Sequence, residues 1–201
     1  MKKQTPLLNK IRGFTFIEMV VVIGIMAIAL PTLYAIFFLI LQQQIKIVRI
    51  SEVQRQGTFV VNTIESLVKK NAYSIHTGSP PSTANRVCAV TTPPVSLTSS
   101  SQLYLKDKAG NSFDFTVPIG TQKISSESAV LGSNSTIDLT SSKVLVVTNS
   151  FSQGCSVSGY ASPVITYSFD LCYNINNSNT CGSASEEVSL HFETTAALPN
   201  Y

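Results

Sequence analysis

The most prominent pattern in the sequence is an apolar run from Met19 to Leu41 that contains no formally charged residue. At about 1.5 Å per helical residue the run reaches about 35 Å, which is enough to cross a hydrocarbon core of about 30 Å. Core helices of soluble domains rarely run this far without a polar face. The run therefore predicts a transmembrane helix, and a buried core helix is the less favoured interpretation.

Beyond Leu41 the pattern changes to that of an amphipathic helix, with apolar residues near helical spacing between charged residues. The apolar positions are Ile45, Val48, Val53, Val60, Ile64, Leu67 and Val68. We predict one helix from about Phe14 to Asn71, whose second half packs its apolar stripe against a sheet. An independent coiled-coil stalk is less favoured because the spacing is irregular and Gly57 interrupts it.

The remainder of the chain has the pattern of a β-rich domain. The helical pattern ends at Gly78–Thr83, and Thr91–Ser101 is a second loop-like tract. The predicted strands are Arg86–Val90, Gln102–Lys106, Ser112–Val117, Thr136–Leu139, Lys143–Thr148, Val164–Tyr173 and Val188–Glu193. Together with the helix they predict an α+β fold, in which a mostly antiparallel sheet has one face on the helix and the other in water.

The last two predicted strands alternate most clearly and suggest a hairpin. The register that matches their apolar faces has the pairs Tyr173–Val188, Leu171–Leu190, Phe169–Phe192 and Asp170–His191. The polar residues 174–187 would form the connecting loop.

Composition and charge narrow the class of protein. Hydrophobic residues make up 44% of the sequence and charged residues 12%, which argues against a disordered chain and against a nucleic-acid module. The net charge of +3 arises from a leader without acidic residues, whose basic residues are Lys2, Lys3, Lys10 and Arg12. By the positive-inside rule the leader stays in the cytoplasm, although Lys46, Arg49 and Arg55 follow the span closely.

A cleaved secretory signal peptide is a competing interpretation of this N-terminus. The sequence Ala27-Ile28-Ala29 resembles a signal-peptidase site. A cut after Ala29 would leave the apolar sequence LPTLYAIFFLIL as a new N-terminus in water, which argues against this interpretation.

All four cysteines follow the span: Cys88, Cys155, Cys172 and Cys181. An even number in a Ser/Thr-rich body indicates disulfides in an oxidising compartment. Of the three possible connectivities, the predicted hairpin favours Cys172–Cys181, which leaves Cys88–Cys155. Zinc is less favoured because the sequence has no C-x₂-C pair.

Glu18 lies within an apolar segment, which disfavours an ionised carboxylate. Glu18 interrupts the sequence GFTFIEMVVVIG, and a carboxylate at mid-membrane costs about 2.5–3.5 kcal/mol. A cut between Gly13 and Phe14 would remove residues 1–13 and leave an α-amine on Phe14, about one helical turn before Glu18. The amine of the same chain or of a neighbouring copy could then neutralise the carboxylate. Alternatively, Glu18 only marks the interfacial end of the helix.

The sequence Arg12-Gly13-Phe14-Thr15-Phe16-Ile17-Glu18, followed by Met19–Gly24, resembles the N-terminal signature of type IV pilins and type II secretion pseudopilins. The resemblance implies cleavage after Gly13 by a membrane-embedded prepilin peptidase and N-methylation of Phe14. It also implies that Glu18 pairs with the N-terminus of an adjacent subunit during filament assembly. The implied fold is pilin-like, with a long N-terminal helix on an antiparallel sheet.

On this interpretation the chain has four parts: the leader 1–13, a transmembrane half-helix 14–41, an amphipathic half-helix 42–71 and an extracytoplasmic β-rich domain 72–201. Pro31 lies slightly earlier than the proline of many major pilins, and it predicts a kink in the helix. The length of the chain, together with a weak resemblance of residues 52–71 to the J-type minor pseudopilins, favours a minor subunit.

The body offers little catalytic or metal-binding chemistry. Asp170 and His191 could form two members of a hydrolytic triad, but the sequence has no G-x-S-x-G, and a cross-strand ion pair explains both residues. Asp107, Asn111 and Asp114 lack the spacing of a calcium loop. We therefore expect no catalytic residue, no metal and no cofactor. Glycosylation sequons begin at Asn134 and Asn176.

These features predict a structural subunit and not an enzyme. We expect a single-pass protein of the inner (cytoplasmic) membrane, with its C-terminal domain outside the cytoplasm, that assembles into a periplasmic or extracellular filament. The expected partners are prepilin peptidase, other pilin or pseudopilin subunits and membrane lipid, without nucleic acid. The alternative is a permanently anchored extracytoplasmic binding module or adhesin with an uncleaved signal anchor, which requires neither Gly13 nor Glu18.

Overall fold

The computed structural model describes residues 13–87, 97–100, 102–117, 122–128, 135–154, 162–175, 181 and 188–198. The chain divides into two units, residues 1–45 and 46–201. The helix α1 (Phe16–Asn71) begins in the first unit and ends in the second. This agrees closely with the helix predicted from the apolar pattern.

The helix begins at Phe16, within two residues of the predicted start at about Phe14, and Thr15 caps it. The carbonyl oxygen of Thr15 accepts hydrogen bonds from the amides of Glu18 at 3.1 Å and Met19 at 3.3 Å. The helix continues through Pro31, where the hydroxyl of Thr32 donates to the carbonyl of Ala29 at 2.8 Å. A hydroxyl bond of this kind helps a helix to accommodate proline in lipid. The kink at Pro31 remains a prediction.

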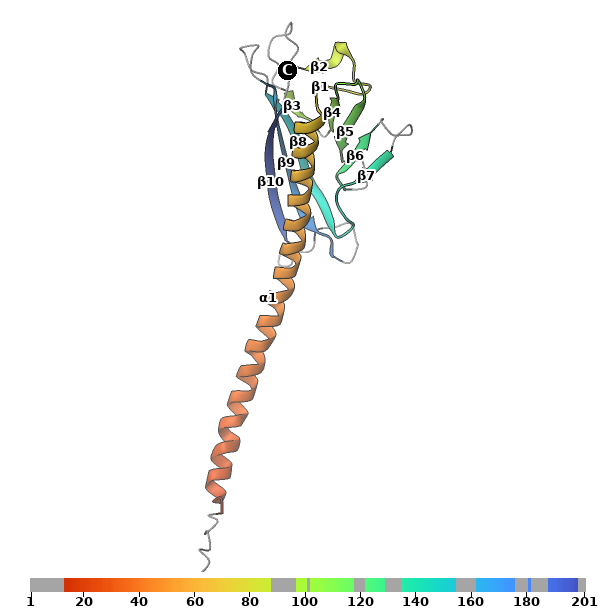
Figure 1. The fold of residues 1–201 in the computed structure, drawn as a ribbon. Helices are drawn as coiled ribbons and strands as arrows, with labels where there is room; N and C mark the ends of the chain where they lie inside the picture. Colours follow the sequence, from red (N-terminus) through yellow and green to blue (C-terminus); the bar gives the residue numbers. More distant parts are fainter. Residues whose placement is uncertain are drawn as a thin grey trace, which may run out of the picture. The chain divides into compact units, whose positions relative to one another are not determined.

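The second unit contains two antiparallel sheets (Figure 1). Their strands are β1 (Ser74–His76), β2 (Arg86–Val87), β3 (Leu97–Ser100), β4 (Gln102–Lys106), β5 (Ser112–Thr116), β6 (Ser125–Ser128), β7 (Ser135–Asp138), β8 (Val144–Gly154), β9 (Val164–Tyr173) and β10 (Ser189–Ala197). A short 3-10 helix, η1 (Thr83–Asn85), precedes β2. The strand orders are β2-β1-β4-β5-β6-β7 and β10-β9-β8-β3.

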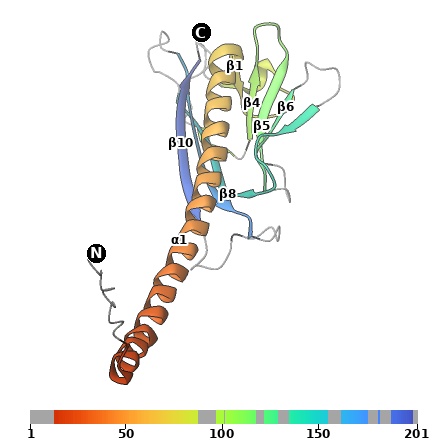
Figure 2. The same cartoon turned by 60° about the horizontal axis from the view of Figure 1, so that its bottom comes forward.

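The expectation of one sheet is therefore wrong, although the α+β class and the antiparallel pairing are confirmed. Alternation along a strand determines which face is buried, but it does not specify how strands divide between sheets. The second half of α1 lies against the junction of the two sheets, with β10 on one side and β4 to β6 on the other (Figure 2). Buried residues of α1 and of both sheets form one core cluster.

Two alternating strands have their predicted bounds, whereas β8 and β10 extend to Gly154 and Ala197, beyond the predicted ends at Thr148 and Glu193, and three strands do not follow from the pattern. β4 and β9 have the predicted bounds, but β1, β3 and β6 are strands that the pattern does not predict. The sequence of β6 is SSES, and β3 lies in the Ser/Thr tract interpreted as a loop, so neither has an apolar alternation to reveal it. Hydrogen bonding to neighbouring strands stabilises these segments as strands, although their own sequences do not favour one.

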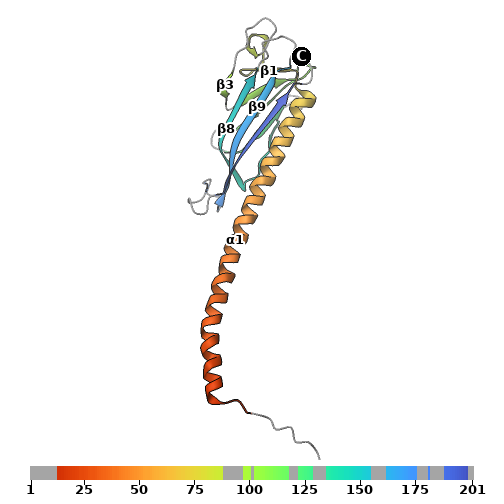
Figure 3. The ribbon, with the colours of Figure 1, turned by 90° about the vertical axis from the view of Figure 1, so that its left-hand side faces the viewer.

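The predicted register of the last hairpin is confirmed. Leu171 pairs with Leu190, Phe169 with Phe192, and Asp170 with His191. The apolar members of this set face the helix, and strands β8 to β10 form one layer beside it (Figure 3).

An aromatic row runs across this layer, formed by Phe151, Tyr167, Phe169 and Phe192. Neighbouring rings are stacked with centroids 4.0, 4.9 and 5.3 Å apart. At its end Phe192 packs directly on the helix at Gly57, where an added Cβ would lie 2.1 Å from the ring. Gly57, which argued against a coiled coil in the sequence, is thus a point of close contact between the helix and the sheet.

Candidate processing and assembly site at the start of the helix

The bond between Gly13 and Phe14 lies in a non-helical stretch directly before α1. Residues 13–15 are exposed and have no regular structure. A Cβ at Gly13 would meet no heavy atom within 4 Å, and Gly13 has no positive φ. The described part of the chain therefore gives no folding reason for glycine at position 13.

Thr15 and Glu18 form one half of a capping box. The spacing T-x-x-E indicates such a box in the sequence, and a helix that starts near Phe14 leaves it out. Besides its carbonyl contact, Thr15 accepts the amide of Glu18 on its hydroxyl at 3.4 Å. Glu18 occupies the third helical position, where a carboxylate is favoured by the helix dipole. Glu18 therefore has two candidate roles, helix capping and pairing with an amine.

The helix that follows is apolar on all sides. Every large apolar side chain from Phe14 to Leu41 is exposed, from 40% at Leu41 to 86% at Phe16. The helix is long and apolar enough to cross a membrane, and no residue in its most apolar segment is buried by the chain itself. An apolar surface of this extent requires lipid or neighbouring proteins to cover it.

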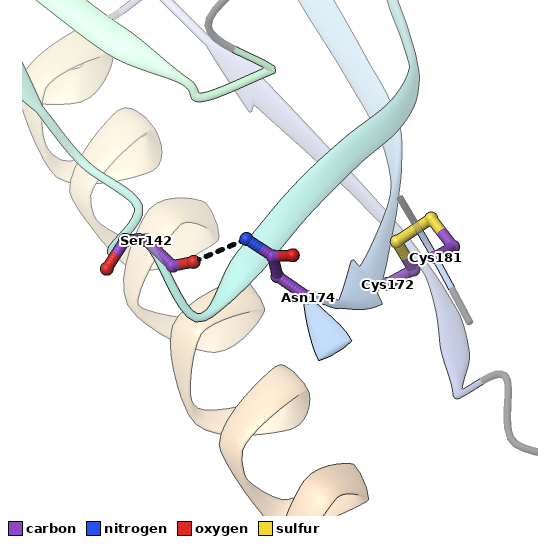
Figure 4. The surroundings of a disulfide bond; sticks show 4 residues. All are labelled: Ser142, Cys172, Asn174 and Cys181. Atoms are coloured by element: carbon purple, nitrogen blue, oxygen red, sulfur yellow. Dashed lines mark hydrogen bonds between the residues drawn. A yellow bond between two sulfur atoms is a disulfide. The ribbon is translucent and has the colours of Figure 1, made fainter. Parts of the chain in front are cut away.

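The disulfide Cys172–Cys181 is present, as predicted (Figure 4). It joins the end of β9 to the following segment, with Cα atoms 5.7 Å apart. Next to it the side-chain amide of Asn174 donates to the carbonyl of Ser142 at 2.9 Å. The predicted pair Cys88–Cys155 and both sequon asparagines, Asn134 and Asn176, lie outside the described residues.

Asp170 and His191 form the predicted cross-strand ion pair, with Nδ1 and Oδ1 2.7 Å apart. Thr148 donates its hydroxyl to the second oxygen of Asp170. Both hydrogen bonds, first that of Thr148 and then that of His191, lower the pKa of Asp170. In a hydrolytic triad the hydroxyl bonds the histidine and not the acid, so this arrangement is a braced ion pair.

His76 is buried in β1, where the sequence gives no sign of a special role. Its Nδ1 lies 2.9 Å from the carbonyl oxygen of Ser82 and 3.0 Å from Oδ1 of Asn85, and its Nε2 lies 2.9 Å from Oγ of Ser74. Burial lowers the pKa of His76. The neutral imidazole therefore ties the strand to the segment that follows it.

The three residues considered for calcium do not converge. Asp107 accepts the amide and the side chain of Asn111 at 2.8 and 2.9 Å in the turn after β4. Asp114 lies on β5 opposite Glu127 of β6. Within the described ranges, no group of three or more His, Cys, Asp and Glu side chains is arranged to hold a metal ion.

Comparison with family models matches residues 8–30 to the prokaryotic N-terminal methylation motif. The matched residues include Gly13, Phe14 and Glu18 and end just before Pro31. No curated protein and no solved structure matches the chain. Residues 8–30 thus carry the prepilin signal of type IV pilins and pseudopilins, and the chain joins this signal to an α+β, pilin-like fold.

Proposed function

We propose that the chain is a structural subunit of a type II secretion pseudopilus or a type IV pilus. Prepilin peptidase cuts it between Gly13 and Phe14, removes the leader 1–13 and methylates Phe14. The observation that supports this most is the methylation motif at residues 8–30, placed at the start of a helix whose apolar surface is exposed on every side. A structural role also fits the braced, triad-unlike geometry of Asp170 and His191.

The proposed mechanism is storage in the inner membrane followed by assembly. Residues 14–41 hold the processed subunit in the bilayer as a single span, where lipid covers the apolar side chains. In the filament, neighbouring helices replace that lipid. The amphipathic residues 42–71 connect the span to the domain 72–201.

Glu18 sets the axial position of one subunit relative to the next during assembly. A carboxylate among apolar neighbours is costly, and an opposite charge close by offsets that cost. The methylated α-amine on Phe14 of an adjacent subunit supplies that charge only when the two helices lie at the correct height. The pair therefore selects one axial position among the many that apolar packing alone would accept.

The proposed location of residues 72–201 is outside the cytoplasm. The disulfide Cys172–Cys181 supports this, because disulfides persist in oxidising compartments. The filament is then periplasmic or extracellular, and the partners are the peptidase, the other pilin or pseudopilin subunits and the membrane lipid. We further propose that the chain is a minor subunit.

Substitutions at Glu18 separate its two candidate roles. Glutamine keeps the chemistry of a capping box at the third helical position but has no charge, whereas alanine has neither. We expect Glu18→Gln and Glu18→Ala to insert in the membrane, to be processed and to be equally absent from purified filaments. Thr15→Ala removes the cap and keeps the charge, so it serves as the control and should enter filaments.

Normal incorporation of Glu18→Gln would contradict the charge pair and would leave capping as the role of Glu18. The alternative function, a permanently anchored binding module, makes a different prediction for Gly13→Val. In our proposal this variant keeps a stable body but is neither cut nor assembled, because a side chain at position 13 disturbs nothing in the fold. A permanent anchor would work normally with valine at this position.

A further inference from the structure

The six-stranded sheet carries a cavity of about 230 Å³ on the face that does not pack in the core. Alternation along β4 and β5 turns Leu103, Leu105 and Phe115 into the core. The same alternation turns Tyr104 and Asp114, which pair across the two strands, to the opposite face. The cavity belongs to residues 46–201 and is separate from the site at the start of α1.

Two carboxylates line this cavity, and neither belongs to an ion pair recorded for the described part of the chain. Asp114 and Glu127 are direct cross-strand neighbours in the β5–β6 ladder, an arrangement in which like charges repel. Burial and the adjacent Glu127 raise the pKa of Asp114 to about 6. The cavity therefore has a concentrated negative charge at neutral pH.

A buried hydroxyl in the same wall also lacks a partner. Thr116 is only 8% exposed and lines the cavity, and its Oγ1 has no hydrogen-bond partner among the described residues. Buried polar atoms are nearly always paired, so each exception calls for an explanation. This oxygen has almost no accessible surface, so it lies behind the wall of the cavity and is not itself a contact for a ligand.

The remaining walls are suited to an organic group. The ring of Tyr104 and the side chain of Pro81 line the cavity beside the two carboxylates, whereas the ring of Phe113 packs against the core on the other face. The rim at residues 79–81 is held in place by Asn85, whose side-chain amide donates to the carbonyls of Gly78 and Pro80, both at 3.1 Å. A rim fixed in this way reduces the entropy lost on binding.

We propose that this cavity binds the guanidinium or ammonium end of a basic side chain presented by another protein chain. The two carboxylates accept its N–H groups, and Tyr104 and Pro81 cover its aliphatic stem. A bare divalent cation would use the carboxylates but would leave the apolar wall without a role. The cavity lies in the body alone, and its binding of a basic side chain does not depend on filament assembly.

A titration with N-acetylarginine amide tests this binding on the full chain in detergent micelles. Amide signals of the ¹⁵N-labelled protein from β4, β5 and β6 should shift in a saturable way, while those of β8 to β10 stay in place. The variant Asp114→Asn/Glu127→Gln should weaken binding by about tenfold or more, because it removes charge-assisted hydrogen bonds. Glu193→Gln, on the exposed side of β10, is the matched control and should bind as the parent does.

Two further titrations decide what the cavity accepts. N-acetylglutamine amide, which is uncharged, should produce no saturable shift, and calcium chloride at equal ionic strength should not displace the arginine derivative. Saturation by calcium alone, equal shifts with the glutamine derivative, or no saturable shift would each overturn the proposal. If the double variant fails to give a folded spectrum, Glu127→Gln alone provides the test, with weaker binding expected and unchanged binding contradicting the role of the carboxylate pair.

Discussion

The two halves of α1 are both rich in apolar residues, but they use them in opposite ways. In residues 46–71 the buried side chains form one stripe, which includes Val53, Val60, Ile64 and Val68, and this stripe joins the core of two sheets. In residues 14–41 every large apolar side chain is exposed. The second half thus completes a domain that stabilises itself, whereas the first half depends on an environment that the chain does not supply.

In the function we propose, this difference lets one chain occupy two settings, the membrane and the filament. The body has its core, its disulfide and its aromatic row whatever surrounds residues 14–41, so the span can exchange lipid for neighbouring helices without unfolding the body. The following substitutions test whether the two regions are energetically separate.

The largest effect is expected from truncation of the aromatic row. Phe169 stacks between Tyr167 and Phe192, so Phe169→Ala should lower the free energy of unfolding of the body by about 3–5 kcal/mol. The matched variant in the first half is Phe37→Ala, which should change this free energy by less than about 0.5 kcal/mol. Chemical denaturation of the full chain in detergent, followed by near-UV circular dichroism, measures both. Comparable losses would show that the regions are coupled.

A second comparison uses two glycines of the same helix. At Gly57 an added methyl group would collide with the ring of Phe192, so Gly57→Ala should destabilise the body by about 1–3 kcal/mol. At Gly24 an added methyl group meets nothing, and Gly24→Ala should leave the body unchanged. A smaller residue at position 192 should make room for the added methyl group at position 57. In a double-mutant cycle, Gly57→Ala and Phe192→Leu together should therefore lower the free energy of unfolding by less than the sum of their separate effects. Additive effects would argue against the close contact.

The cavity on the six-stranded sheet predicts a stabilising substitution. Because burial and Glu127 raise the pKa of Asp114 to about 6, the folded state holds its proton more tightly than the unfolded chain. This contribution to stability is present in acid and is lost as the pH rises through about 6. With a discount for solvent screening, Asp114→Asn should raise the free energy of unfolding by about 1 kcal/mol at about pH 7.5 and by nothing below about pH 4.

Asp138→Asn is the control for this pH dependence, because Asp138 already has a cation partner in Lys123 at 2.8 Å. It should be neutral or slightly destabilising at neutral pH. Denaturation curves across this pH range measure the free energy of unfolding of both variants. An equal pH dependence would contradict the claim that the folded state disfavours the ionised form of Asp114.

The smallest effect is expected from a hydroxyl in the core. The Tyr167 side chain is buried, and its hydroxyl oxygen has no hydrogen-bond partner within the ranges that the structure describes. Tyr167→Phe removes this oxygen and keeps the stacked ring, so the free energy of unfolding should stay within about 0.5 kcal/mol or rise slightly. A loss of more than about 1 kcal/mol would indicate a hydrogen bond that the structure lacks.

Strong, regular patterns in the sequence predict the features that depend on them. The extent of α1, the register of β9 and β10, the Asp170–His191 pair and the Cys172–Cys181 bridge all follow from periodicity and the matching of faces. The division into two sheets was not predictable, because alternation does not identify a strand's partner.

The candidate site at the start of α1 could be read from the motif, whereas the cavity could not. Gly13, Phe14 and Glu18 are neighbours in the sequence, so their spacing alone carries the signal. Asp114, Glu127 and Thr116 meet only through the pairing of β5 with β6, and β6 has no apolar alternation that would reveal it as a strand.

The working form of this protein, in the function we propose, is a processed and methylated subunit. Intact-mass measurement of the protein extracted from its own membranes, and of the same protein in purified filaments, tests this most directly. We predict a chain that begins at Phe14 and carries one added methyl group in both fractions. A chain that still carries the leader lysines Lys2 and Lys3 in both fractions would contradict it.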